Sequence, residues 1–206
     1  MPEKVMRKID RRTIYTKMVV KDALLEIIQN RSFEKITVTS VCKQAEVTRA
    51  TFYLHFDDLT AVLDEILEDA LQITENVSDH SNEDILHIFH LITSAERDPE
   101  KLKECDSLLP VCQRMADLPK YRVLFLDESL SEYIIKKIFQ AEKEKMVPLL
   151  IQYCHLPFEK AEMIFLFAIY GSFSVNKKLG WKKDKEWYEM QGTLIRFILG
   201  GMDALR

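Results

Sequence analysis

The spacing of apolar residues is the feature of this sequence that most limits its fold. Between residues 59 and 77 they recur every three or four positions, so that they share one face of a helix. Nothing after residue 57 alternates convincingly in the way a half-buried strand does. The chain has only five glycines and six prolines, fewer than a sheet protein with many tight turns uses. We therefore expect an all-α fold.

Apolar spacing and capping signals mark three helices near the N-terminus. The first is predicted over residues 13–30. Thr37 and Thr48 are good N-caps for short helices over 38–45 and 49–55, because a threonine hydroxyl accepts a hydrogen bond from an unpaired backbone N–H group. These segments are separated by short connectors, so the three helices are expected to pack on one another.

A longer helix is predicted to join this N-terminal part to the rest of the chain. It covers residues 59–77, with Asp57 or Asp58 as its N-cap, and a polar stretch at 78–82 follows it. We predict a head domain over 1–57, a linking helix over 58–77 and a C-terminal domain over 78–206. Further helices are predicted over residues 83–96, 100–116, 121–153, 158–178 and 185–205.

The charges of the chain are distributed unevenly. Residues 1–56 hold eleven Lys and Arg against six Asp and Glu, a net charge of +5, and begin with a basic arm over 1–12. Residues 57–206 hold eighteen against twenty-seven, a net charge of −9. A basic head on an acidic body is typical of a protein whose head binds nucleic acid, although chance clustering gives the same pattern.

The N-terminus lacks the apolar segment of a secretory signal. The longest charge-free apolar run, residues 163–176, is 14 residues long and too short to cross a membrane. We therefore expect a cytoplasmic protein without a membrane partner. The four cysteines form no CxxC pair and are expected to be reduced core residues rather than metal ligands or redox sensors. They are Cys42, Cys105, Cys112 and Cys154.

Two short helices joined by a tight turn, after a longer helix, form a candidate helix-turn-helix. In such a motif the second short helix enters the major groove of DNA and the first lies across the backbone. Here Val47, Phe52 and Phe56 are expected to face inward. The outward-facing positions are expected to be Arg49, Ala50, Thr51, Tyr53 and His55. Many helical bundles contain this pattern without binding DNA, so the pattern alone leaves both interpretations open.

The string ITVTSVCKQAEVTRATFYLHF, residues 36–56, resembles the signature of the TetR family of repressors. That signature reads, loosely, T-V-x-x-I-A-x-x-A-G-V-S-x-G-T-F/L-Y-x-H/Y-F. The positions that match or substitute closely are Thr37, Val38, Val41, Ala45, Val47, Thr48, Thr51, Phe52, Tyr53, His55 and Phe56. The resemblance is firm over residues 10–75. It implies an all-α dimeric repressor, with an N-terminal three-helix helix-turn-helix DNA-binding domain followed by a helical-bundle domain for ligand binding and dimerisation.

Three positions depart from the family's pattern. The usual turn glycine is Glu46 here, so the turn must tolerate a side chain, with strain if its φ is positive. The usual glycine of the recognition helix is Ala50, which favours helix. The usual lysine at the start of the fourth helix is Leu59 or Asp58, which removes an expected phosphate contact. DNA affinity is therefore expected to depend more on the basic arm.

The resemblance also implies which residues contact DNA. Tyr53 and His55 would contact phosphates, together with Thr39 or Ser40 at the start of the second helix. Arg49 and Thr51 are expected at base edges, because an arginine can bond two acceptors on guanine. Arg49 on phosphate alone, His55 as a surface residue and Tyr53 as a core residue remain alternatives. The expected contact set is Thr37, Thr39, Ser40, Lys43, Thr48, Arg49, Ala50, Thr51, Tyr53 and His55, and the expected partner is double-stranded DNA with a palindromic operator.

The last two predicted helices are the expected dimer interface. Residues 163–175 are apolar nearly all round, which predicts a helix buried on two faces. Residues 165–181 resemble the penultimate helix of one TetR group, in which a small residue and a tryptophan flank the dimer surface. Two such helices from each subunit would form a four-helix interface, and the alternative is a monomer's internal core. The expected interface residues are Phe167, Gly171, Val175, Trp181, Leu194 and Ile198.

A ligand pocket is implied by the same resemblance. Such pockets are lined by apolar and aromatic side chains with a few polar groups. The candidates are Phe89, Met115, Phe125, Tyr133, Phe165 and Tyr170, with His87 and His90 as polar groups. Each of them is also a candidate core residue. The effector is expected to be a small molecule that the sequence does not name, and no cofactor or metal is expected.

Two other classes of protein compete with this interpretation. An enzyme would be expected to carry a recognisable motif, and the chain contains no GxGxxG, P-loop, GxSxG or HExxH pattern. His87 and His90, three residues apart near Glu83 and Asp84, could bind a metal, but a helix surface collects such groups freely. A helical protein that only binds other proteins would not need the string at residues 36–56.

Overall fold

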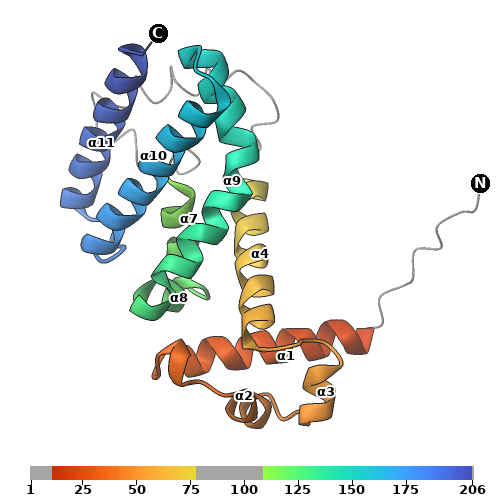
Figure 1. The fold of residues 1–206 in the computed structure, drawn as a ribbon. Helices are drawn as coiled ribbons and strands as arrows, with labels where there is room; N and C mark the ends of the chain where they lie inside the picture. The colour runs from red at the N-terminus through yellow and green to blue at the C-terminus, as the bar shows by residue number, and fades with distance from the viewer. Residues whose placement is uncertain (1–10, 78–108, 206) are drawn as a thin grey trace, which may run out of the picture. The chain divides into compact units, whose positions relative to one another are not determined.

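The computed structural model describes residues 11–77 and 109–205. Within these ranges every regular element is a helix and none is a strand (Figure 1), which confirms the predicted all-α fold. The chain divides into two compact units between Asp69 and Ala70, inside the helix predicted to link the two domains. The basic arm up to residue 10, the polar stretch 78–82, the predicted helix 83–96 and residues 100–108 lie outside the described residues.

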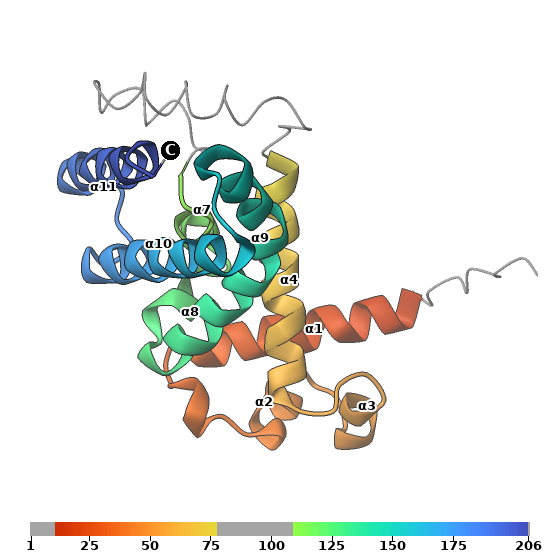
Figure 2. The same ribbon diagram turned by 45° about the horizontal axis from the view of Figure 1, so that its top comes forward.

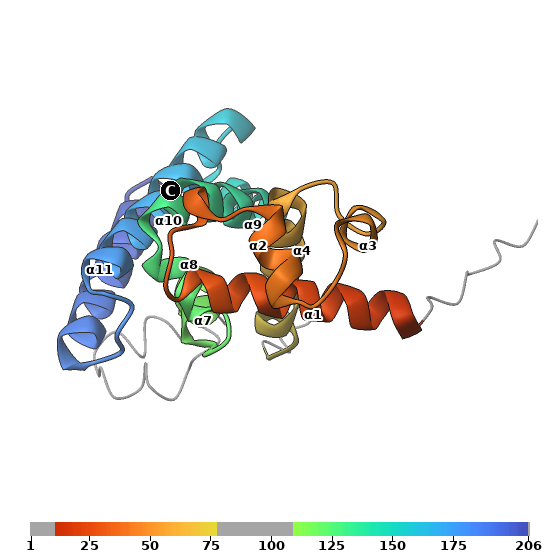
Figure 3. The same cartoon turned by 90° about the horizontal axis from the view of Figure 1, so that it is seen from below.

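Short helices around α1 form the N-terminal unit. In chain order its elements are α1 (Arg11–Ile28), the 3₁₀ turn η1 (Phe33–Lys35), α2 (Val38–Gln44), α3 (Arg49–Tyr53) and the first part of α4 (Leu59–Val77). α2 and α3 lie along the same side of α1 (Figure 3). The fully buried side chains at the centre of this unit are Val20, Leu24, Val41, Phe52, Val62 and Ile66. The predicted helix bounds agree with these elements to within two residues.

Two lysines of α1 hold the first part of α4 through ion pairs. Lys17 Nζ lies 2.5 Å from Glu65 Oε1, and Lys21 Nζ lies 2.6 Å from Asp69 Oδ2. Pairs of this partial exposure stabilise by only about 1 kcal/mol or less each, so they orient the helices more than they stabilise them. Asp58 caps α4, because its Oδ1 accepts a hydrogen bond from the Ala61 N–H.

The C-terminal unit is a bundle in which α10 lies between α9 and α11 (Figure 1, Figure 2). Its elements after the C-terminal part of α4 are α7 (Val111–Asp117), α8 (Arg122–Leu126), η3 (Glu128–Leu130), α9 (Ser131–Cys154), α10 (Phe158–Lys178) and α11 (Lys185–Asp203). The predicted helix at 158–178 coincides with α10. Phe139 of α9 stacks on Phe165 of α10, with ring centroids 5.5 Å apart, and this contact joins the two longest helices of the unit.

The prediction of one continuous helix over residues 121–153 is wrong. Asp127 interrupts it, because its Oδ1 accepts hydrogen bonds from both the backbone N–H and the hydroxyl of Ser129. An aspartate that bonds to the backbone two residues ahead competes with the helical hydrogen bond. Among the prolines, Pro110 directly precedes α7, whereas Pro148 lies inside α9 without ending it.

Trp181 lies in the interior of the C-terminal unit, which corrects its predicted place in the dimer interface. Its side chain is 1% exposed and makes edge contacts with the rings of Phe125 and Phe173, at 4.9 and 5.0 Å between centroids. Its indole N–H donates to the Phe125 carbonyl at 3.0 Å. A side chain enclosed in this way by its own chain offers no surface to a second subunit.

Asn176 of α10 is the centre of a buried polar cluster. Its Oδ1 accepts hydrogen bonds from Trp187 Nε1 at 2.6 Å and from Gln191 Nε2 at 3.2 Å, both on α11. Its Nδ2 donates to the carbonyl of Ser172. All three side chains of this cluster are buried. The cluster therefore fixes how α11 packs on α10, because each buried polar group depends on the others for a partner.

α10 is buried on one face only within a single chain, although residues 163–175 are nearly all apolar. Phe165, Ile169 and Phe173 are buried, while Phe167 is 66% exposed and Met163 is 57% exposed. The expected burial on two faces is therefore not met inside the protomer. Exposed Phe167 also argues against the alternative that this surface is a monomer's core.

Three of the cysteines are described, and all three are buried and outside any disulfide: Cys42, Cys112 and Cys154. Burial raises the pKa of the Cys112 thiol to about 12, which keeps it protonated and unreactive near neutral pH. Cys105 lies outside the described residues. No helix in ranges 11–77 and 109–205 is both long enough and apolar enough to span a bilayer.

Candidate nucleic-acid interface

Threonine side chains begin both short helices of the head, as the sequence predicts. Thr37 Oγ1 accepts a hydrogen bond from the Ser40 N–H at 3.2 Å, and Ser40 Oγ accepts one from the Thr37 N–H at 3.1 Å. This reciprocal pair is a capping box at the start of α2. Thr48 Oγ1 accepts from the Thr51 N–H at 3.0 Å at the start of α3. Both helices therefore start at positions set by their own neighbouring residues.

The turn between α2 and α3 reverses through Glu46. The Val47 N–H donates to the Cys42 carbonyl at 3.0 Å, and the Glu46 N–H donates to the Lys43 carbonyl at 3.4 Å. This pair of bonds is the Schellman arrangement that ends many helices, and it needs a left-handed residue. Glu46 supplies it with φ of 54°, where glycine is normally favoured, so the turn carries strain of order 1 kcal/mol.

The two faces of α3 differ in burial. Phe52 is fully buried and meets the ring of Phe56 at 5.7 Å. Arg49 is exposed and Tyr53 is 48% exposed. One buried side chain anchors this five-residue helix to the unit. Its other side chains are exposed or half-buried. The predicted inward positions Phe52 and Phe56 are therefore buried, and Val47 is half-buried.

The Arg49 side chain contacts the ring of Tyr53 on the same helix. Its guanidinium carbon lies 5.8 Å from the centroid of the Tyr53 ring, a cation–π contact. Burial raises the pKa of the Cys42 thiol, and the positive charge of Arg49 opposes that shift, so the guanidinium also lies near α2. The contact with the Tyr53 ring therefore orients the guanidinium.

The other predicted contact residues fall into two groups. Thr37 and Ser40 bond to each other, as do the hydroxyls of Thr48 and Thr51 at 2.9 Å, so these four side chains act first as caps. The structure leaves the remaining side chains exposed or half-buried on the same two helices and the turn after them. They are Thr39, Lys43, Arg49, Ala50, Tyr53 and His55.

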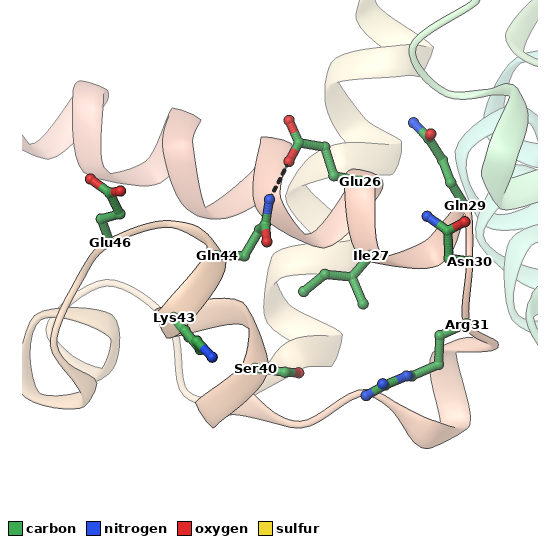
Figure 4. A pocket seen from close by; sticks show the side chains of 9 residues that line it. All are labelled: Glu26, Ile27, Gln29, Asn30, Arg31, Ser40, Lys43, Gln44 and Glu46. Carbon is green, nitrogen blue, oxygen red and sulfur yellow. Dashed lines mark hydrogen bonds between the residues drawn. The ribbon is translucent and has the colours of Figure 1, made fainter.

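A polar groove of about 980 Å³ lies between the C-terminal end of α1 and α2 (Figure 4). Its lining residues include Glu26, Arg31, Lys43, Gln44 and Glu46. Arg31 lies in the connector after α1, where a single arginine has no periodic pattern that marks it in the sequence. The groove brings Arg31 beside α2, a proximity that depends on how the connector folds back.

The predicted ligand-pocket residues differ in burial. Met115, Phe125 and Phe165 are buried in the core of the C-terminal unit, and Phe125 and Phe165 belong to different ring clusters. Tyr133 is half-buried with Lys137 Nζ 5.5 Å from its ring, and Tyr170 is 37% exposed. Phe89, His87 and His90 lie outside the described residues. The described part of the chain holds no group of side chains arranged to bind a metal ion.

Comparison with known proteins gives a short sequence match and structural likenesses. No family model matches the chain. Over 50 residues, 24% of its length, the chain is 32% identical to the uncharacterized HTH-type transcriptional regulator YxbF of Bacillus subtilis (strain 168), and this match spans 13% of that protein. The structure of the dihydroxyacetone kinase operon activator DhaS resembles it with a TM-score of 0.40 and 16% identity, over 93% of this chain and 98% of that one. The sequence match points to a transcription regulator.

Proposed function

We propose that this chain is a DNA-binding transcriptional regulator of the TetR type, a repressor that leaves its operator when a small-molecule effector binds. The observation that carries the proposal is the division of α3 into two faces. Phe52 is fully buried in the head, while Arg49 and Tyr53 are exposed on the same short helix. A short helix anchored in this way, after a first helix and a tight turn, has the form that enters a major groove.

Arg49 and Tyr53 have different roles in this proposal. Arg49 reads a base, because its guanidinium has five N–H donors in a fixed fork that fits the two acceptors of guanine. Tyr53 supports the guanidinium with its ring and binds a phosphate with its hydroxyl. Thr39, Lys43 and His55 add phosphate contacts around the same groove. Thr51 is a weaker base contact, because its hydroxyl already bonds to Thr48.

A homodimer is part of the proposal. A protein that reads a palindromic operator must present two heads about one DNA turn apart, roughly 34–36 Å. The exposed Phe167 of α10 and Phe197 of α11, 66% and 65% exposed, support a second copy of this chain as the group that covers them. The interface would include Phe167, Gly171, Val175, Leu194 and Ile198.

The effector would act through that dimer. A ligand that binds both states of a protein equally shifts nothing, so release requires that it favour a state with a different spacing of the heads. We place the effector in the C-terminal unit because the resemblance assigns sensing to that domain. Its chemistry is left open in this proposal.

Replacement of Arg49 by alanine tests the function at the level of single base pairs. We expect Arg49→Ala to lose on the order of 1–3 kcal/mol of discrimination at particular base pairs and to bind operator variants more evenly. Tyr53→Phe is the matched control, because it keeps the ring under the guanidinium and removes only the hydroxyl. Tyr53→Phe should weaken binding to every sequence by the same factor. Fluorescence anisotropy on a set of single-substitution duplexes measures both, and a uniform loss for Arg49→Ala would assign Arg49 to phosphate.

A further inference from the structure

The groove between α1 and α2 has a basic edge and an edge with a hydrogen-bonded carboxylate. On one side Glu26 Oε2 accepts a hydrogen bond from Gln44 Nε2 at 2.6 Å, which engages that carboxylate. On the other side lie Lys43 and Arg31, with Ser40 between them (Figure 4). Glu46 lies at the far end of the groove from Arg31. The two cations therefore share one edge of the groove.

Arg31 and Lys43 have no ion-pair partner in the part of the chain that the structure describes, although the lysines of α1 are paired with α4. Both side chains are exposed. The Ser40 hydroxyl between them donates to the Thr37 carbonyl at 2.7 Å, so its proton is not available to a ligand. This edge can therefore bind a ligand through its two positive charges. Such a pair suits an anion with several acceptor oxygens.

The position of this edge relative to α3 identifies the anion. α2 and α3 lie on the same side of α1 (Figure 3), and when the second helix of such a pair enters the major groove, the first lies across the DNA backbone. Lys43 is on α2, and Arg31 extends the basic edge into the connector before it. We propose that Arg31, together with Lys43, binds a backbone phosphate of the DNA beside the base pairs that α3 contacts. This inference rests on the proposed function and adds Arg31 to the interface.

Removal of the Arg31 charge tests the inference through the salt dependence of binding. Anisotropy of a labelled duplex is measured over a series of KCl concentrations for the wild type, Arg31→Ala and Arg31→Lys. We expect Arg31→Ala to reduce the slope of log K against log salt by about 0.9 for each bound protomer, and affinity to fall roughly three- to tenfold at ~0.1 M salt, equally for all sequences. Arg31→Lys should restore most of the slope.

Lys35→Ala is the matched control, because Lys35 is an exposed cation of the same connector that does not line the groove. An unchanged slope for Arg31→Ala, or an equal effect from Lys35→Ala, would overturn the inference while leaving the proposed function standing. A wild-type chain that binds no duplex would instead overturn the proposed function. Inorganic pyrophosphate is titrated into the DNA-free protein as a separate arm. Tight binding that Arg31→Ala removes, with no change in DNA affinity, would assign the edge to a free anion and contradict the DNA contact.

Discussion

A glutamate in place of Gly171 is expected to give a folded monomer that no longer holds its operator. Gly171 lies on the exposed face of α10, and a Cβ built there meets no atom within 4 Å. The protomer can therefore accept the new side chain, and replacing a glycine inside a helix favours folding by roughly 0.5–1 kcal/mol. Between two subunits, the same glutamate would place a charge in an apolar contact and keep the helices apart.

Loss of the dimer should lower operator affinity by about 100-fold or more. In a dimer, the second head binds at a high effective concentration once the first is bound, and a monomer loses that advantage. Gly201→Glu on α11 is the matched control, because Gly201 is also exposed and free of neighbours within 4 Å, and it is not among the proposed interface residues. Sedimentation velocity at micromolar concentration and thermal unfolding measure assembly and fold. A stable dimer of Gly171→Glu would place the interface elsewhere, and a monomeric wild type would remove the premise.

Replacement of Asn176 by leucine is expected to destabilise the C-terminal unit by about 2–4 kcal/mol. The change removes the acceptor of two buried donors, the Trp187 indole N–H and the Gln191 amide. A buried donor left without a partner costs about 1–3 kcal/mol, and the two costs add here. Leucine has the same number of side-chain heavy atoms as asparagine and branches at the same carbon, so we expect the polar loss to be the dominant effect.

Tryptophan fluorescence during urea unfolding measures this change in the right unit. The chain has two tryptophans, Trp181 and Trp187, and both are buried in the C-terminal unit. Ser174→Ala is the control on the same helix, because Ser174 is exposed and its hydroxyl bonds only to the Tyr170 carbonyl, so we expect less than about 0.5 kcal/mol. Equal midpoints for Asn176→Leu and the wild type would show that the cluster does not fix the packing of α11.

The helix starts could be predicted from the sequence because they depend on neighbouring residues. Thr37, Thr48 and Asp58 cap their helices through hydrogen bonds to N–H groups three residues ahead. The turn at Glu46 is also set locally. A turn of this type needs a left-handed residue whichever side chain stands there, and the φ of Glu46 is 54°. Such contacts lie within a few positions, where sequence pattern is informative.

Apart from the local break at Asp127, the errors concern contacts between distant segments. Trp181 was expected at the dimer surface, but its burial depends on Phe125, which lies 56 residues earlier in the chain. The apolar content of α10 does not reveal which face its own chain covers, so burial on two faces was expected, whereas Phe167 is exposed in the protomer. Arg31 was not among the predicted contact residues for the same reason. Its place beside α2 depends on the groove that forms when the connector folds back.

Selection of DNA from a pool of random duplexes by the purified chain tests whether α3 reads a base sequence. We expect repeated rounds to enrich an inverted repeat whose half-sites are centred about 10–10.5 base pairs, or a multiple of that spacing, apart. We also expect binding to the enriched sequence to weaken steeply as salt rises. A pool that remains random, or equal affinity for enriched and starting DNA, would contradict the claim that α3 reads a base sequence.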